Sequence, residues 1–408
     1  MTPDHSLRTQ PSRTAAPSSD AMSAPPAPPP PAPAVAAAGG PRTGFVYDGR
    51  LGELYGIFLM NLLWTFLTLS IFRFWAKTRM RRYLWSRTSL NGDRFEYTGT
   101  GGELFIGFLI VMAVYVVASI AVTALGIMAG PESALSLILQ YCLGVTILYL
   151  TFVAQYAAQR YRLTRTIWRG ISGGMTGSAW AWGFKGMWFS ILSLLSLTLA
   201  WPWAQMRLID DRINNSYFGD AKASIQTSSR SLYKSYVIGT LVALLVSGGI
   251  AYAAYSYITS NYGDTLAELF SVTEQNPDRA AEYSEAFTVL YVTVIGTYLL
   301  IFVVSILAFA AYYAAIAREV ARNLALGTLR FATPVTAGAI INRYLWNLVI
   351  IVFTLGLGLP IAIHRSMQFL AANIQVIGEI EGSDITHANL PRPKSGEGLL
   401  EAFDPGIM

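Results

Sequence analysis

The side chains best suited to chemistry in this chain are hydroxyl, amide and arginine groups that recur three times at equal spacing. In each copy a hydroxyl residue followed by Leu stands eleven positions before an arginine. The three pairs are Thr68 with Arg79, Ser196 with Arg207, and Thr354 with Arg365. An asparagine, Asn61 or Asn347, stands seven positions before the hydroxyl in the first and third copies, whereas the second copy has Phe189 there. Hydroxyl and amide groups can coordinate a solute, and arginine can bind anionic lipid headgroups.

This spacing predicts two kinds of site. The first is a central polar site, in which the three copies meet and present hydroxyl, amide and backbone carbonyl groups to a solute. Its predicted lining residues are Asn61, Thr68, Ser196, Asn347 and Thr354. The second is a set of contacts to anionic headgroups. Its predicted residues are Arg79, Arg207, Arg365, Trp75 and Trp203. Structural alternatives explain both sets: each asparagine holds one helix to its neighbour, and the Arg and Trp side chains anchor helix ends.

Signals for enzymatic or metal chemistry are weak. The sequence has no His-Glu-x-x-His motif, no P-loop with its lysine, and no paired carboxylates within an apolar run. The three histidines, His5, His364 and His387, are far apart, and Cys142 is the only cysteine. We therefore expect a protein that is not an enzyme and that has no cofactor, no metal site and no internal disulfide.

The composition is that of a membrane protein. Hydrophobic residues make up 53% of the chain and charged residues 13%, against about 25% charged in soluble domains. Four long runs contain no Asp, Glu, Lys or Arg, and each is long enough to cross a bilayer as a helix. These runs are Leu104–Met128, Leu135–Ala158, Ser235–Ile258 and Phe287–Ala317. The net charge of +5 comes from basic residues beside apolar runs, which favours anionic lipid over nucleic acid as a partner.

The distribution of charge predicts which connections lie in the cytoplasm. Seven basic residues and one Asp lie between Arg73 and Arg94. The segments 155–185, 204–234 and 317–345 are also basic, whereas 259–288 has six acidic groups and 129–134 has only Glu132. The positive-inside rule is satisfied everywhere if each repeated unit enters the membrane and returns through an extended return strand. Seven plain crossings remain the alternative, because each unit is about long enough to span. Both arrangements place the C-terminus in the cytoplasm.

Three segments are expected along the chain. Residues 1–44 contain 11 of the 19 prolines and should form a disordered tail. Residues 45–385 form the membrane domain, and 386–408 form a flexible C-terminal tail. The segment Phe45–Leu54 recurs as Phe95–Leu104 with six identical positions. Alternating aromatic residues before glycine predict two short extended segments, Phe45–Tyr47 and Phe95–Tyr97, each followed by a helix with a glutamate in its first turn.

The predicted fold class is all-α: a polytopic helical membrane protein with three tandem repeated units, re-entrant or spanning, between two long transmembrane hairpins. The Phe-x-Tyr-x-Gly block at Phe45, the run Thr68–Lys77, the helix Arg81–Trp85 and the segment Asn214–Gly219 resemble the uncharacterised YjgN-like family of bacterial inner-membrane proteins. The resemblance implies a multi-pass protein of the inner membrane and no established activity. We expect a passive conduit or transporter for a small solute or lipid, or alternatively a non-enzymatic membrane-organising protein that contacts anionic headgroups.

Overall fold

The computed structural model describes residues 42–130, 133–275 and 284–378. The tails predicted to be disordered or flexible, 1–44 and 386–408, lie outside these residues except for Arg42–Gly44, which begin the first strand. The described segments form ten helices. They are α1 (Leu51–Leu67), α2 (Arg73–Ser86), α3 (Gly101–Ala129), α4 (Ala134–Thr164), α5 (Ala179–Leu195), α6 (Trp201–Asn214), α7 (Arg230–Gln275), α8 (Ser284–Asn323), α9 (Ala337–Phe353) and α10 (Leu359–Asn373).

Ten short strands in the same segments close into one antiparallel barrel. They are β1 (Arg42–Tyr47), β2 (Thr88–Leu90), β3 (Asp93–Tyr97), β4 (Thr166–Trp168), β5 (Ile171–Met175), β6 (Ser216–Phe218), β7 (Ala221–Ser224), β8 (Ala325–Leu326), β9 (Leu329–Ala332) and β10 (Gln375–Ile377). Each strand pairs with the strands before and after it in sequence, and β1 closes the ring on β10, where Thr43 faces Val376. The predicted all-α class is therefore wrong.

Helix pairs and tight turns alternate around the ring. A pair of helices follows each odd-numbered strand, and a tight turn follows β2, β4, β6 and β8. Because neighbouring strands are antiparallel, all five helix pairs leave the same end of the barrel and return to it, and the tight turns lie at the other end. The predicted order of three repeated units between two long hairpins is replaced by five helix pairs that alternate short, long, short, long, short.

Two of the tight turns use left-handed backbone conformations. Asn91 and Gly92 have φ angles of 53° and 88°, and Arg169 and Gly170 have 52° and 77°. Positive φ at both central residues gives the turn whose twist matches that of the flanking strands. Glycine adopts such angles without strain, and asparagine does so more readily than most residues. These turns set the register in which β2 pairs with β3 and β4 pairs with β5.

The interior of the barrel is a packed core. Leu90, Trp168, Leu329 and Val376 are buried there, and aromatic rings pack against them. The ring centroids of Phe45 and Phe95 are 6.0 Å apart, and those of Phe95 and Trp168 are 6.1 Å apart. Such offset stacking adds to the stabilisation that comes from burial. The barrel therefore holds the helix pairs in place and is filled along its axis by side chains.

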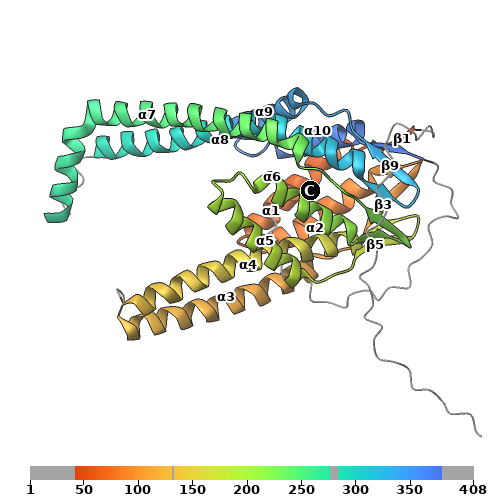
Figure 1. The fold of residues 1–408 in the computed structure, drawn as a ribbon, viewed down its shortest axis with the longest axis horizontal. Coiled ribbons are helices and arrows are strands. Elements are labelled where there is room, and N and C mark those ends of the chain that lie inside the picture. Colours follow the sequence, from red (N-terminus) through yellow and green to blue (C-terminus); the bar gives the residue numbers. More distant parts are fainter. Residues whose placement is uncertain (1–41, 131–132, 276–283, 379–408) are drawn as a thin grey trace, which may run out of the picture. The chain divides into compact units, whose positions relative to one another are not determined.

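The long pairs contain the predicted transmembrane runs. α3 packs along α4, and α7 packs along α8 (Figure 1). These four helices are long and apolar enough to cross a membrane. Their windows of highest hydropathy have between 6% and 11% of residues buried, so the apolar side chains face outward, as they do in lipid.

The short pairs are α1–α2, α5–α6 and α9–α10. Each pair reverses direction through a five-residue turn, in which Leu69, Leu197 and Leu355 have φ angles of 48°, 51° and 50°. The predicted return strand is wrong, because a second helix begins directly after each turn. The three leucines are 89%, 84% and 93% exposed. The tips of the short pairs are thus apolar surfaces, whereas the predicted extended segments Phe45–Tyr47 and Phe95–Tyr97 are confirmed as parts of β1 and β3.

A glycine sets how closely the first short pair approaches the first long pair. A methyl group added at Gly101 would lie 2.6 Å from Cγ and 2.7 Å from Cα of Trp75. We expect Gly101→Ala to lower the free energy of unfolding by about 1–3 kcal/mol, because the backbone of α2 must shift. The control is Gly102→Ala, where nothing lies within 4 Å. Thermal unfolding in detergent should show loss of stability only at position 101, and equal effects at both positions would contradict this packing.

Candidate lipid-contact site

The hydroxyl groups predicted to line a polar site form hydrogen bonds within the turns of the short pairs. Thr68 Oγ1 donates to the Trp64 carbonyl at 2.7 Å and accepts from the Phe72 N–H at 2.9 Å. Thr354 makes the same two contacts, and Ser196 donates to the Ser193 carbonyl, three residues earlier, and accepts from the Ala200 N–H. Each hydroxyl thus satisfies backbone groups left open where one helix ends and the next begins. The recurring spacing follows from this repeated turn.

The two asparagines join the helices of their own pairs. Asn61 is buried, and its Nδ2 donates to the Ala76 carbonyl on α2 at 3.2 Å. Asn347 Nδ2 donates to the Ala362 carbonyl at 3.4 Å and to Ser366 Oγ at 3.2 Å. In the middle pair the rings of Phe189 and Trp203 pack 4.9 Å apart instead. These contacts favour the structural role, and the described contacts of the five predicted lining residues stay within their own helix pairs.

Asn61 also faces a groove that joins two short pairs. The groove lies between α1, α2 and α10 and has a volume of about 390 Å³. Most of its walls are apolar, and include Phe58, Leu62 and Ile363. Its polar lining consists of Asn61, Thr65, Arg73 and Lys77, and it includes no carboxylate. An apolar groove with two cations can hold an acyl chain along its walls and a negative headgroup at its edge.

The cations of this groove lie in the first turns of α2. Arg73 is exposed, and its guanidinium carbon lies 4.9 Å from the Phe74 ring and 5.0 Å from the Phe108 ring. The aromatic faces hold the guanidinium without neutralising its charge. Sequence reasoning missed Arg73 and Lys77 as site residues, although the pattern of Arg, Lys and Trp directly after the turn was visible.

The predicted headgroup residues lie at matching places in the second helices. Arg79, Arg207 and Arg365 are each the seventh residue of α2, α6 or α10. Arg79 and Arg207 are exposed and Arg365 is partly buried, and Arg79 Nη1 lies 3.5 Å from Asn61 Oδ1. Trp75 packs on the Phe105 ring at 5.5 Å, and Trp203 packs on Phe189. Trp75 therefore joins the first short pair to α3, and Trp203 joins α6 to α5.

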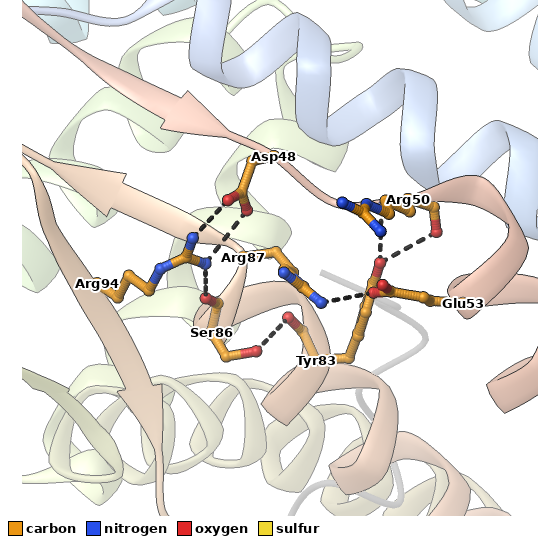
Figure 2. Close-up of polar contacts among 7 residues, drawn as sticks. All are labelled: Asp48, Arg50, Glu53, Tyr83, Ser86, Arg87 and Arg94. Carbon is orange, nitrogen blue, oxygen red and sulfur yellow. Dashed lines mark hydrogen bonds and ion pairs between the residues drawn. The ribbon is translucent and has the colours of Figure 1, made fainter.

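A polar cluster ties the base of the first pair to the barrel (Figure 2). Arg87, which follows α2, donates to Glu53 in the first turn of α1 at 2.7 Å. The Tyr83 hydroxyl donates to the Arg50 carbonyl at 3.0 Å and accepts from the Arg50 N–H at 2.8 Å. Arg94 on β3 binds both carboxylate oxygens of Asp48. These contacts fix where the helices leave the strands, so we read the cluster as structural.

An equivalent set of polar contacts joins the two ends of the second pair. Glu103 is in the first turn of α3, and Arg165, which follows α4, donates to its carboxylate at 2.6 Å. The Tyr161 hydroxyl donates to the same glutamate at 2.6 Å. Glu103 also completes a capping box with Thr100, which satisfies open N–H groups at the helix start. The sequence predicted both glutamates at helix starts but did not predict their partners. A shared Tyr-x-x-x-Arg pattern, at Tyr83–Arg87 and Tyr161–Arg165, could have identified these partners.

One short motif has the letters of a hydrolase signature. Residues Gly170–Gly174 read Gly-x-Ser-x-Gly, which in hydrolases forms a strained turn from a strand into a helix. Here Ser172 lies inside β5, directly after the tight turn, and pairs with Ile167. The motif is therefore part of a strand and lacks the required backbone geometry. Among the described residues, no group of three or more His, Cys, Asp or Glu side chains could hold a metal ion.

Comparisons with known proteins agree on the class of protein. The family described as bacterial protein of unknown function (DUF898) matches residues 42–402. The inner membrane protein YjgN of Salmonella typhimurium strain LT2 is 25% identical over 384 residues, which is 86% of this chain and 92% of that protein. YjgN of Escherichia coli K12 is 34% identical over 84 residues, 21% of either chain. No solved structure matches. With its four apolar helices, this chain is a membrane protein.

The ion pair at the rim of the barrel gives a pH-dependent prediction. The hydrogen bonds from Arg94 lower the pKa of Asp48. A carboxyl whose pKa is lowered by folding adds stability above its unfolded pKa of about 3.9 and loses that stability as the pH falls through the folded pKa. We expect the protein to unfold at a higher temperature than Asp48→Asn at pH 6, by a few degrees at most. The difference should shrink as the pH falls toward the lowered pKa of Asp48.

The control for this prediction is Glu96→Gln on β3. Glu96 is exposed, so its substitution removes a carboxylate near the same rim without removing the Arg94 contact. Unfolding followed by circular dichroism in detergent between pH 3 and pH 7 is the measurement. A stability difference between Asp48→Asn and the parent that did not change with pH would show that the ion pair does not carry the effect.

Proposed function

This chain belongs to the DUF898 family of bacterial proteins, and we propose that it is a non-enzymatic inner-membrane protein that binds anionic lipid. The proposal places the headgroup at the cations of the groove between α1, α2 and α10 and an acyl chain along the apolar walls. The carrying observation is this pairing of Arg73 and Lys77 with walls such as Phe58 and Ile363. Anionic headgroups of the inner leaflet supply the complementary charge.

The charges support a cytoplasmic barrel. The segments 73–94, 155–185, 204–234 and 317–345, which contain strands of the barrel, are basic. The segment 259–288, which includes the end of α7 and the start of α8, is acidic. By the positive-inside rule the barrel faces the cytoplasm and the tips of the long pairs face outside. β10, the last described element, lies in the same barrel, and this supports a cytoplasmic side for the C-terminus in our proposal.

Helix lengths determine how deeply each pair enters the bilayer. α3 has 29 residues and is therefore about 44 Å long, which exceeds the hydrocarbon core of about 30 Å. α1 has 17 residues, so it reaches only about 26 Å. In this proposal the long pairs cross the membrane and return, and the short pairs enter from the cytoplasm and turn within the lipid. The exposed leucines at their tips then face acyl chains.

A passive conduit is the weaker candidate. The hydroxyl groups expected to face a solute are bonded within their turns, and aromatic side chains fill the barrel axis. Lipid binding uses Arg73, which is exposed at the groove. Headgroup contacts at Arg79, Arg207 and Arg365 extend the same role to the other short pairs.

The test of this function removes the two groove cations together. We expect Arg73→Gln with Lys77→Gln to weaken binding of phosphatidylglycerol about 10- to 100-fold, since each Lys or Arg near an anionic surface contributes about 1 kcal/mol. Native mass spectrometry in a neutral detergent, with phosphatidylglycerol and phosphatidylcholine of equal chain length, measures both affinities. Binding of phosphatidylcholine should change little.

The matched control removes two positive charges elsewhere. Lys222 on β7 and Arg322 on α8 are exposed and do not line the groove, so Lys222→Gln with Arg322→Gln should leave phosphatidylglycerol binding unchanged. Equal affinity of the parent protein for both lipids would overturn the proposal. So would an equal loss in the two double variants, because net charge alone would then explain binding.

A further inference from the structure

A second cavity lies at the other side of the last short pair. It is formed by the end of α8, by β9, and by α9 and α10, and has a volume of about 370 Å³. This volume is within the range of about 300–1,000 Å³ found for small-molecule sites. Aliphatic and aromatic side chains form most of the lining, among them Val320, Ile340, Phe331 and Leu370.

One cation, Arg343, lines this cavity. Its guanidinium carbon lies 5.2 Å from the Tyr344 ring and 5.1 Å from the Phe369 ring. Its Nε atom is buried and has no hydrogen-bond partner among the described residues. The lining contains no carboxylate. The two rings offset part of the cost of removing this charge from water, but they leave the Nε donor without a hydrogen-bond acceptor.

We infer that this cavity binds a free fatty acid, whose carboxylate pairs with Arg343 and whose chain lies against the apolar wall. A planar guanidinium matches a carboxylate in geometry. One positive group balances one negative charge, and a cavity of this size lined on one side by α8 suits a single chain. The site is separate from the groove at α1 and α2, so it does not depend on the function proposed for that groove.

The experiment uses a palmitate analogue that carries a diazirine in its chain, added to the full-length protein in vesicles of phosphatidylcholine. After illumination, mass spectrometry of peptides should place labels on α8, α9 and α10 near Val320 and Ile340. Excess palmitate should suppress this labelling, and excess hexadecanol, which has the chain without the charge, should not. Labels spread over all apolar helices, or equal suppression by hexadecanol, would overturn the inference.

Two variants distinguish the contribution of the Arg343 charge to labelling from the contribution of the cavity itself. Arg343→Gln should lower labelling at least fivefold, and Ala321→Trp, which fills the cavity and keeps the arginine, should lower it as much. Arg322→Gln removes an exposed charge one residue away from Ala321 and should have no effect. The Arg73→Gln, Lys77→Gln double variant should label normally, which distinguishes failure of this inference from failure of the groove proposal. Normal labelling of a folded Arg343→Gln protein, judged by its unfolding temperature, would contradict the role of the arginine.

Discussion

Closure of ten strands in sequence order is the constraint from which the rest of this structure follows. In an antiparallel ring, the chain must leave and re-enter at one end through every second connection. Helices inserted there have to come as pairs that reverse direction, whatever their length. The ring therefore accommodates both the long apolar pairs and the short pairs. All of these pairs leave the same end of the barrel. No strand edge is left open, which matters for a barrel whose strands are only two to six residues long.

Each helix pair also has to be held at a defined angle to the ring. In the first two pairs, a glutamate in the first turn of the first helix binds an arginine that follows the second helix: Glu53 with Arg87, and Glu103 with Arg165. Both ion pairs are partly exposed, so each adds modest stability by itself. Their value is positional, because they join the two points at which the chain leaves and re-enters the barrel. The same rim supports the groove at α1, α2 and α10.

The sequence predicted the helical part of the fold well and the barrel poorly. Runs without charge identified the four long helices, and the alternating aromatic residues identified Phe45–Tyr47 and Phe95–Tyr97 as extended. Strands such as Thr88–Leu90 and Ala325–Leu326 are too short to show an alternating pattern, and their pairing depends on residues far apart in the chain. The spacing of Thr68, Ser196 and Thr354 drew attention to these residues, but it could not show that their hydroxyls form hydrogen bonds within turns. The groove at α1, α2 and α10 and the cavity at α8, α9 and α10 are formed between different helix pairs. A local sequence pattern does not show which helix pairs come together.

We propose that the short pairs turn inside the membrane and return to a cytoplasmic barrel. Cysteine scanning in a Cys142→Ala background tests it most directly, with Leu69→Cys, Leu197→Cys and Leu355→Cys at the tips and Lys222→Cys on the barrel. A membrane-impermeant maleimide is applied to sealed vesicles of both orientations. We expect position 222 to be labelled only from the cytoplasmic side and the three tips to be labelled from neither side. Labelling of the tips from the periplasmic side would show that the short pairs cross the membrane and do not turn within it.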